Sequence, residues 1–191
     1  MKFLIIDSHP YSESFNRQLT RKIEEVVKEK HEVEMLNLVD DGFNPVMDTA
    51  SLKLFSTGKS ADLKVEEYQK KINEADCLVF AFPIWWSTMP AILKGFLDKV
   101  FLYGYAYISG ENGALEGLFS KQAVVITTME TPNSVYNEML NNPVKNHFIN
   151  ATLATCGIQT LKHFQIDKIN SGTDDYRKDS FNQIVEYFKK L

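Results

Sequence analysis

Apolar residues along the chain alternate between short continuous runs and longer stretches with helical spacing. The continuous runs, together with one alternating stretch, predict five strands, at residues 2–7, 31–38, 77–82, 122–128 and 160–166. Apolar residues three and four positions apart predict helices between them, at residues 15–27, 65–74, 90–101, 143–156 and 176–191. Strands that alternate with helices predict one α/β domain over residues 1–191, a three-layer sandwich around a five-stranded parallel sheet.

The loop after the first strand helps to choose between the two common strand orders of such a sheet. Residues 8–16 lack both the G-x-G-x-x-G pattern of dinucleotide-binding folds and the P-loop pattern. The flavodoxin-like order 2-1-3-4-5, with its crevice between strands one and three, fits better. It brings three loops together at the carboxyl edge of the sheet, at residues 9–16, 83–89 and 128–132. We expect residues 40–61 to form a long ordered loop and residues 108–119 a glycine-containing linker.

The first of these loops has the composition of an anion site. Ser12, Ser14 and Asn16 stand at the start of a predicted helix, where free backbone N–H groups and the helix dipole favour negative charge. Ordinary helix capping by Ser12 or Ser14 is the alternative. His9 is held by the proline that follows it, either as a phosphate partner or as a strand-end residue satisfied by backbone.

The second loop carries three large apolar residues in succession, Ile84, Trp85 and Trp86. No regular element turns all three toward one core, so we expect at least one tryptophan to line a cavity or an interface; the alternative is that both are plain core residues. Two tryptophans offer a flat aromatic ligand about 150–250 Å² of contact each. A phosphate loop and an aromatic loop at one crevice suit a nucleotide with a flat head, a description that a flavin meets.

Composition and charge exclude several classes of protein. A net charge of −4 over 191 residues carries no basic footprint for nucleic acid. Cys77 and Cys156 lie far apart in apolar settings, which favours two buried reduced thiols over a metal site. The apolar run at residues 3–6 is too short for a signal peptide or a membrane span. We therefore expect a cytoplasmic protein with no integral membrane segment and no metal.

Several short motifs together resemble the NAD(P)H:quinone oxidoreductase family, the flavodoxin-like group that includes DT-diaphorase and modulator of drug activity B. The resemblance runs in register from Met1 to about Thr128 and weakens afterwards. Its most specific part is P-A-I-L-K-G after an aromatic loop. The segments that carry it include His9-Pro10, Ser14-Phe15-Asn16, Phe43-Asn44-Pro45, Phe82-Pro83 through Trp86, Pro90 to Gly95, Gly104 to Tyr107 and Ile126-Thr127-Thr128.

The resemblance implies a flavoenzyme that reduces quinones or similar small aromatic acceptors by two electrons, with NAD(P)H as co-substrate and ping-pong hydride transfer. It implies a non-covalent flavin and a homodimer. The matches at His9 and at Phe43-Asn44-Pro45 favour FAD, with FMN as the alternative. Part of the segment 103–107, with its three tyrosines, and the helix from Pro90 are the expected subunit contact.

Carried over by position, the resemblance also implies the site residues. The catalytic residue would be Tyr136. The residues that would bind the flavin are His9, Ser14, Phe15, Asn16, Pro83, Ile84, Trp85, Trp86, Thr127, Thr128 and Met129. The chain departs from the family where Met129-Glu130-Thr131-Pro132 replaces the usual glycines, and where Asn142 lies near the place of the histidine that accompanies the tyrosine.

Two other functions share parts of this pattern. An electron-transfer flavodoxin would have the same fold, although the first loop lacks the serine/threonine-glycine phosphate signature of those proteins. A regulatory subunit of a potassium efflux system is the other alternative, since some relatives of the quinone reductases have that role. Reduction by NADPH without a partner reductase would distinguish an oxidoreductase from a flavodoxin, and co-purification with a membrane protein would favour the regulatory role.

Overall fold

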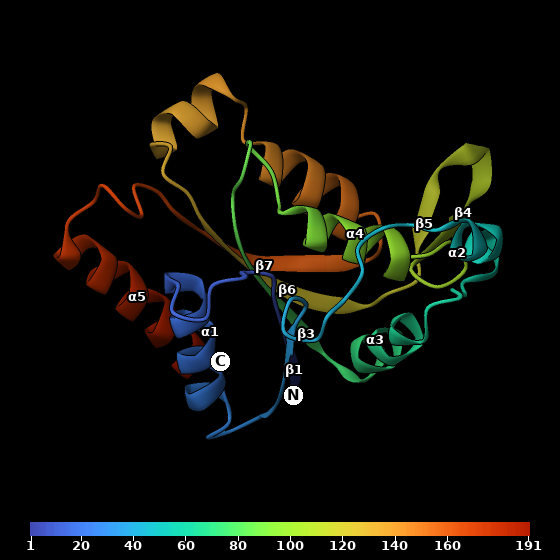
Figure 1. Cartoon of the computed structure of the whole chain (residues 1–191), viewed down its shortest axis with the longest axis horizontal. Helices are drawn as coiled ribbons and strands as arrows, with labels where there is room; N and C mark the ends of the chain where they lie inside the picture. Colours follow the sequence, from blue (N-terminus) through green and yellow to red (C-terminus); the bar gives the residue numbers. More distant parts are fainter.

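A sheet of five parallel strands forms the centre of the molecule (Figure 1). The computed structural model describes the backbone of residues 1–191 and every side chain except that of Asn112. The strands are ordered β2 (Glu32–Asn37), β1 (Lys2–Asp7), β3 (Cys77–Pro83), β6 (Lys121–Thr128) and β7 (Ile158–Ile166). This confirms the predicted order 2-1-3-4-5 and the crevice between the first and third strands of the chain.

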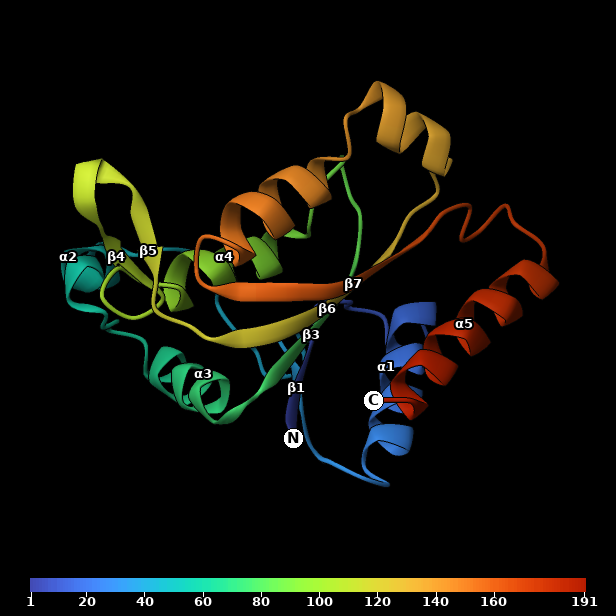
Figure 2. The same ribbon diagram turned by 180° about the vertical axis from the view of Figure 1, so that it is seen from behind.

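Helices cover both faces of the sheet, which confirms the three-layer sandwich (Figures 1 and 2). One face packs against α1 (Phe15–Val27) and α5 (Asp174–Lys189). The other face packs against α3 (Leu63–Glu74), α4 (Ala91–Val100) and the π-helix η4 (Val144–Leu153). Successive strand residues point to opposite faces, so Val79 belongs to the first core and Phe80 to the second.

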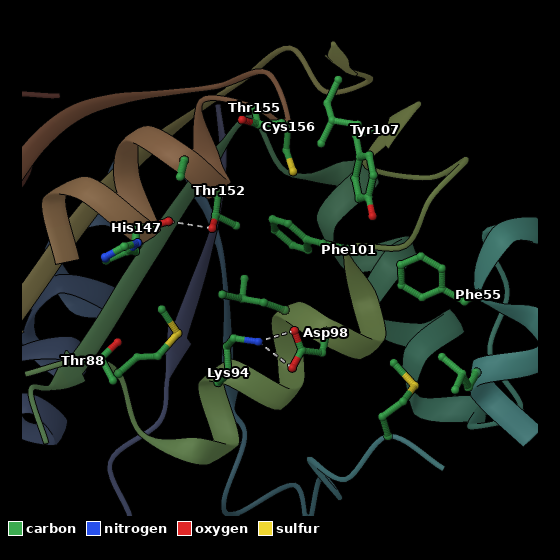
Figure 3. A pocket seen from close by; sticks show the side chains of 16 residues that line it. Phe55, Thr88, Lys94, Asp98, Phe101, Tyr107, His147, Thr152, Thr155 and Cys156 are labelled. Atoms are coloured by element: carbon green, nitrogen blue, oxygen red, sulfur yellow. Dashed lines mark hydrogen bonds and ion pairs between the residues drawn. The ribbon is translucent and has the colours of Figure 1, made fainter. Parts of the chain in front are cut away.

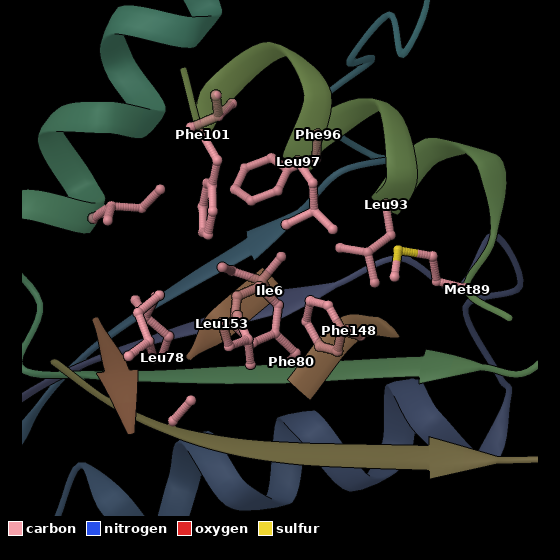
Figure 4. Close-up of a cluster of buried hydrophobic side chains, with 14 of the residues drawn as sticks. Ile6, Leu78, Phe80, Met89, Leu93, Phe96, Leu97, Phe101, Phe148 and Leu153 are labelled. Carbon is pink, nitrogen blue, oxygen red and sulfur yellow. The ribbon is translucent and has the colours of Figure 1, made fainter. Parts of the chain in front are cut away.

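The core beneath α4 and η4 is rich in aromatic rings (Figure 4). Phe80 on β3 meets Phe148 of η4 edge to face, with ring centroids 5.1 Å apart, and Leu93 and Phe96 reach down from α4. All four side chains are fully buried. Since edge-to-face pairs add to the area that such rings remove from water, this packing fixes α4 and η4 on the sheet.

Three residues of the segments that carry the resemblance, Asn44, Pro45 and Gly95, have a structural role on this same face. A Cβ at Gly95 would lie 2.2 Å from the carbonyl oxygen of Pro45, so only glycine lets α4 approach the 43–45 segment this closely. Lys99, almost fully buried, donates to Asn44 O at 2.9 Å and to Asp62 Oδ2 at 2.7 Å. These contacts tie the long segment after β2 onto α4.

Two segments contain more regular structure than the sequence predicts. Within residues 40–61 lie the short helix α2 (Thr49–Leu54), capped by Asp48, and the 3₁₀ turn η1 (Phe55–Thr57). Beyond α4, β4 (Tyr107–Ser109) and β5 (Leu115–Gly117) form an antiparallel hairpin around the 3₁₀ turn η2 (Glu111–Gly113). Both predictions were wrong because elements of three to six residues with exposed faces leave no apolar periodicity to detect.

The segment after β6 also differs from expectation. It begins with an additional short π-helix, η3 (Val135–Met139), which projects from the body of the molecule at the top of Figure 1. Of the helix predicted over residues 143–156, residues 144–153 are helical, with π geometry; Gly157, with a φ of 82°, lies at the end of the turn that follows. Both cysteines are free and buried. In the part of the chain that the structure describes, no helix is long and apolar enough to cross a membrane.

Candidate functional site

A cavity of about 460 Å³ lies at the carboxyl edge of the sheet, where the loops after β1, β3 and β6 meet. We call it the crevice cavity. This is the position where open α/β sheets bind ligands. The residues that line it are His9, Tyr11, Ser14, Phe15, Asn16, Pro83, Ile84, Trp85, Thr128, Met129, Glu130, Ile169 and Asn170. The structure thus brings together nine of the twelve residues proposed from the sequence.

The start of α1 forms one end of this cavity, which we call the phosphate end. Ser14 caps the helix by accepting from the N–H of Arg17 at 3.2 Å, while the N–H groups of Phe15 and Asn16 belong to the first turn, which has no intrahelical acceptors. Asn16 is only 1% exposed, and neither its amide nitrogen nor its amide oxygen has a protein partner among the described residues. A buried amide without partners is costly, so it marks a place for a polar ligand.

His9 completes the phosphate end with a defined tautomer. The backbone N–H of Tyr11 donates to its Nδ1 at 3.1 Å, so Nδ1 is the acceptor and Nε2 carries the proton in the neutral ring. Burial, together with the charge of Arg17, lowers the pKa of His9. The imidazole is therefore a neutral hydrogen-bond donor at neutral pH.

The tryptophan loop forms the other end of the cavity, which we call the ring end. Trp85 and Thr88 exchange two backbone hydrogen bonds, of 2.9 and 3.1 Å, around Trp86 and Ser87. Both central residues have positive φ, 48° and 65°, the pattern of a type I′ turn. Such backbone costs about 1–3 kcal/mol for a side chain other than glycine. This turn is therefore strained beside the cavity.

The two tryptophans are placed differently by this turn. Trp85 lines the cavity, and its ring lies edge-on to that of His9 at 6.2 Å. Trp86 is 100% exposed at the tip of the turn and does not line the cavity. The structure therefore does not bring Trp86 into the site, although the sequence interpretation placed it beside the flavin ring.

Tyr136, the expected catalytic residue, is also outside the cavity. It is 1% exposed, and its hydroxyl donates to Ser87 O at 2.9 Å and accepts from the N–H of Val144 at 3.2 Å. Burial raises the pKa of this phenol. The geometry makes Tyr136 a brace between the strained turn and the start of η4.

The end of β6 divides its residues between the two faces of the sheet. Thr128 and Met129 line the cavity, and Thr128 O accepts from the N–H of Ile84 at 2.7 Å. Thr127 does not line it: side chains alternate along a strand, and the Thr127 hydroxyl lies 2.9 Å from Nε2 of His163. Burial lowers the pKa of His163 to about 4. Of the twelve residues proposed from the sequence, Thr127, Trp86 and Tyr136 are the three that the cavity leaves out.

Four lining residues were not predicted from the sequence: Tyr11, Glu130, Ile169 and Asn170. The last two follow β7, so the rule that ligands bind at the carboxyl ends of parallel strands could have found them. The Glu130 carboxylate accepts from the N–H groups of Asn170 and Ser171, at 2.8 and 3.2 Å, and fastens the loop after β7 to the loop after β6. Met129 N–H is occupied by Ile166 O at 2.9 Å, so it is not free to hold a ligand.

A second cavity of about 510 Å³, the apolar groove, lies between α4, η4, α2 and β4 (Figure 3). Phe55, Phe101 and Tyr107 line one side, and His147 of η4 lies on the opposite side. Its one ion pair among the residues drawn joins Lys94 to both carboxylate oxygens of Asp98, at 2.6 and 2.8 Å. Apart from that pair the groove is mostly hydrophobic.

Comparison with known proteins finds similar sequences and structures over the full length of the chain. A family model described as having a flavodoxin-like fold matches residues 1–191. A Haemophilus influenzae protein named as an uncharacterized NAD(P)H oxidoreductase is 32% identical over 182 residues, covering 93% of this chain and 89% of the relative. Human ribosyldihydronicotinamide dehydrogenase [quinone] is 29% identical, covering 84% of this chain and 78% of its own. A crystal structure from Streptococcus mutans, 31% identical, superimposes over the full length of both chains with a TM-score of 0.87.

Proposed function

The chain belongs to the flavodoxin-like fold family, and we propose that it is a flavin-dependent NAD(P)H oxidoreductase that reduces quinones. The observation that carries the proposal is the crevice cavity, where an anion-binding helix start and an aromatic wall meet in one space of about 460 Å³. The names of the relatives agree with that chemistry.

The phosphate end fits the phosphate of a flavin nucleotide. The first N–H groups of α1, the unpartnered Asn16 amide and the Nε2–H of neutral His9 are all donors. Such donors suit an anion because charge-assisted hydrogen bonds are about twice as strong as neutral ones. Among the described residues, no lysine or arginine lines this part of the cavity. Backbone N–H groups and neutral side chains would therefore bind the phosphate.

The ring end fits the isoalloxazine ring. Pro83, Ile84 and Trp85 supply an apolar wall, and Thr128 and Met129 of the neighbouring strand end continue the lining beside it. These residues exclude water and fix the plane of the ring. When bound, the flavin accepts two electrons from NAD(P)H and passes them to the acceptor.

FAD is the flavin that we propose, with FMN as the alternative. A smaller cavity of about 270 Å³ shares Phe15 with the crevice cavity. Asp174, Arg177 and Lys178 line it, and Arg177 is paired with Asp174. The charge of Lys178 suits the pyrophosphate part of a dinucleotide. FMN would leave this second cavity unused.

We also propose a homodimer in which the apolar groove is covered by a second copy of the chain. Leu52 and Leu115, which line it, are 61% and 52% exposed, and Tyr107 contributes an aromatic wall. Exposed apolar residues gathered around one groove mark interaction surfaces. The groove includes part of the segment 103–107 and of α4, the contact expected from the sequence. A cytoplasmic location is part of the same proposal.

The test of the proposed function begins with the chromophore. Heating the purified protein should release FAD, about one per chain, and rapid mixing with NADPH or NADH without oxygen should bleach the bound flavin without a partner reductase. A quinone should then restore the oxidised spectrum. A protein that stays colourless after soaking with either flavin would contradict the proposal, and reduction only through a partner reductase would favour an electron-transfer flavodoxin.

A further inference from the structure

Two buried charges beneath the phosphate end were not anticipated from the sequence and do not line the crevice cavity. Asp7 is the last residue of β1 and 1% exposed; Arg17 is in the first turn of α1 and 8% exposed. Arg17 Nε lies 3.7 Å from Asp7 Oδ2, and its Nη2 binds the exposed carboxylate of Asp40. Burying charges costs free energy unless they are paired and hydrogen-bonded. We therefore examine what this buried pair contacts.

The pair holds the backbone of His9 from both sides. Asp7 Oδ1 accepts from the N–H of His9 at 2.8 Å, and Arg17 Nη1 donates to the carbonyl oxygen of His9 at 3.4 Å. Thr20 donates to the other oxygen of Asp7 at 2.9 Å and fixes the carboxylate in this orientation. The position of His9 is thus set by side chains that come from the strand before it and the helix after it.

The ring of His9 is set as well. The N–H of Tyr11 binds Nδ1 at 3.1 Å, which leaves Nε2–H as the donor available to a ligand in the cavity that His9 lines. Arg17 itself is tied by its backbone N–H to the capping hydroxyl of Ser14. One residue therefore links the helix cap, the His9 peptide and the buried carboxylate.

We propose that Asp7 and Arg17 are positioning residues that hold His9 and the start of α1 in place for the phosphate group of a flavin nucleotide. This inference rests on the proposed function. Because the pair acts through His9 and the helix start, it sets the preference for a phosphorylated flavin over riboflavin, which lacks the phosphate. A pair that only supported the fold would affect both ligands alike.

The experiment compares dissociation constants for FMN and riboflavin in the apoprotein and its variants. In Arg17→Met, His9 is no longer held in place, so its hydrogen bond to the phosphate should be lost. Loss of one hydrogen bond to an anion should raise the dissociation constant of FMN by about tenfold or more, while that of riboflavin stays unchanged. Arg21→Met, on the same helix but exposed, is the matched control and should change neither. Equal weakening of both flavins, or weakening of neither, would overturn the inference.

A second variant and a second probe keep the test decisive. Removing Arg17 alone leaves Asp7 buried without its cation, so the double variant Asp7→Asn/Arg17→Met replaces it if the single variant does not fold. Inorganic phosphate should raise the melting temperature of the wild-type apoprotein and of Arg21→Met, but not of the Arg17 variants. If the wild type binds neither flavin, the proposed function fails, yet the phosphate measurement still decides the positioning role: stabilisation that survives in the Arg17 variants would overturn it.

Discussion

The two ends of the crevice cavity are built in opposite ways. At the phosphate end the polar groups are buried and held from several sides, as with Asn16 at 1% exposure and the His9 peptide clamped by Asp7 and Arg17. At the ring end a strained turn carries Trp85 at 47% and Trp86 at 100% exposure. One end is fixed before any ligand arrives, and the other is open.

This difference indicates that the phosphate end supplies affinity for the flavin and that the ring end admits the substrates. Groups that are ordered in advance lose little entropy on binding, so affinity is best supplied by the phosphate end. An enzyme that must admit a co-substrate and then an acceptor to the same face needs an exposed ring end.

The largest effect is expected at Asn16, whose buried amide has no protein partner in the described residues. Asn16→Leu should raise the dissociation constant of the flavin about 10- to 100-fold, since a hydrogen bond to a charged group contributes about 1.5–3 kcal/mol. The melting temperature of the apoprotein should not fall, because two unsatisfied buried atoms are removed. Gln18→Leu, an exposed site on the same helix, is the control; a less stable variant with normal flavin affinity would make Asn16 a core residue and remove the contrast.

The second prediction separates the two tryptophans. Trp85→Ala, at the cavity wall, should raise the dissociation constant about tenfold, the loss of roughly 1.4 kcal/mol of ring contact. Trp86→Ala should leave affinity unchanged and stability within about 0.5 kcal/mol, as for exposed substitutions generally. Titration of both variants with the same flavin checks this ranking. A larger effect of Trp86→Ala than of Trp85→Ala would mean that the tip of the turn closes over the ligand. Trp86 would then lie beside the flavin ring, as the sequence interpretation proposed.

The fold could be predicted from the sequence because the apolar patterns of its strands and helices are long and regular. Continuous apolar runs such as 77–82 specify buried parallel strands, and the order of strands and helices then fixes the carboxyl edge where the loops meet. The hairpin of β4 and β5 escaped because three-residue strands have no measurable period. The positions of most lining residues followed from strand order alone.

The directions of individual side chains were not accessible in the same way. Trp86 and Trp85 are neighbours, yet positive φ at Trp86 sends one away from the cavity and leaves the other in it. The hydroxyl of Tyr136 donates a hydrogen bond to the carbonyl oxygen of Ser87, which lies 49 positions away in the chain. Asp7 and Arg17 meet only because β1 and α1 pack together. Such pairings depend on tertiary geometry, which periodicity does not encode.

The third prediction concerns the brace beneath the ring end. Tyr136→Phe removes a buried hydroxyl that serves Ser87 O and the N–H of Val144. It should lower the free energy of unfolding by about 1–3 kcal/mol and slow flavin reduction only modestly, which thermal melting and rapid mixing will measure. Tyr187→Phe, at a partly buried tyrosine that packs on Phe164, controls for loss of a hydroxyl elsewhere. A large loss of rate at unchanged stability would instead make Tyr136 catalytic.

The smallest effect expected is that of pH, where both ends should behave alike. Burial lowers the pKa of His9 at the phosphate end, and that of His163 behind Thr127 from 6.5 to about 4. Because the unfolded chain then binds more protons than the folded one, His163 contributes stability that is complete above pH 6.5 and is lost as pH falls toward about 4. Thermal melting should follow this slope, and His163→Gln should flatten it. Flavin reduction, however, should show no single-proton step centred on pH 6.5, because burial lowers the pKa of both histidines below that ordinary value. A single-proton step near pH 6.5 that disappears in His147→Asn would contradict this, and would assign the proton to the exposed histidine beside the apolar groove.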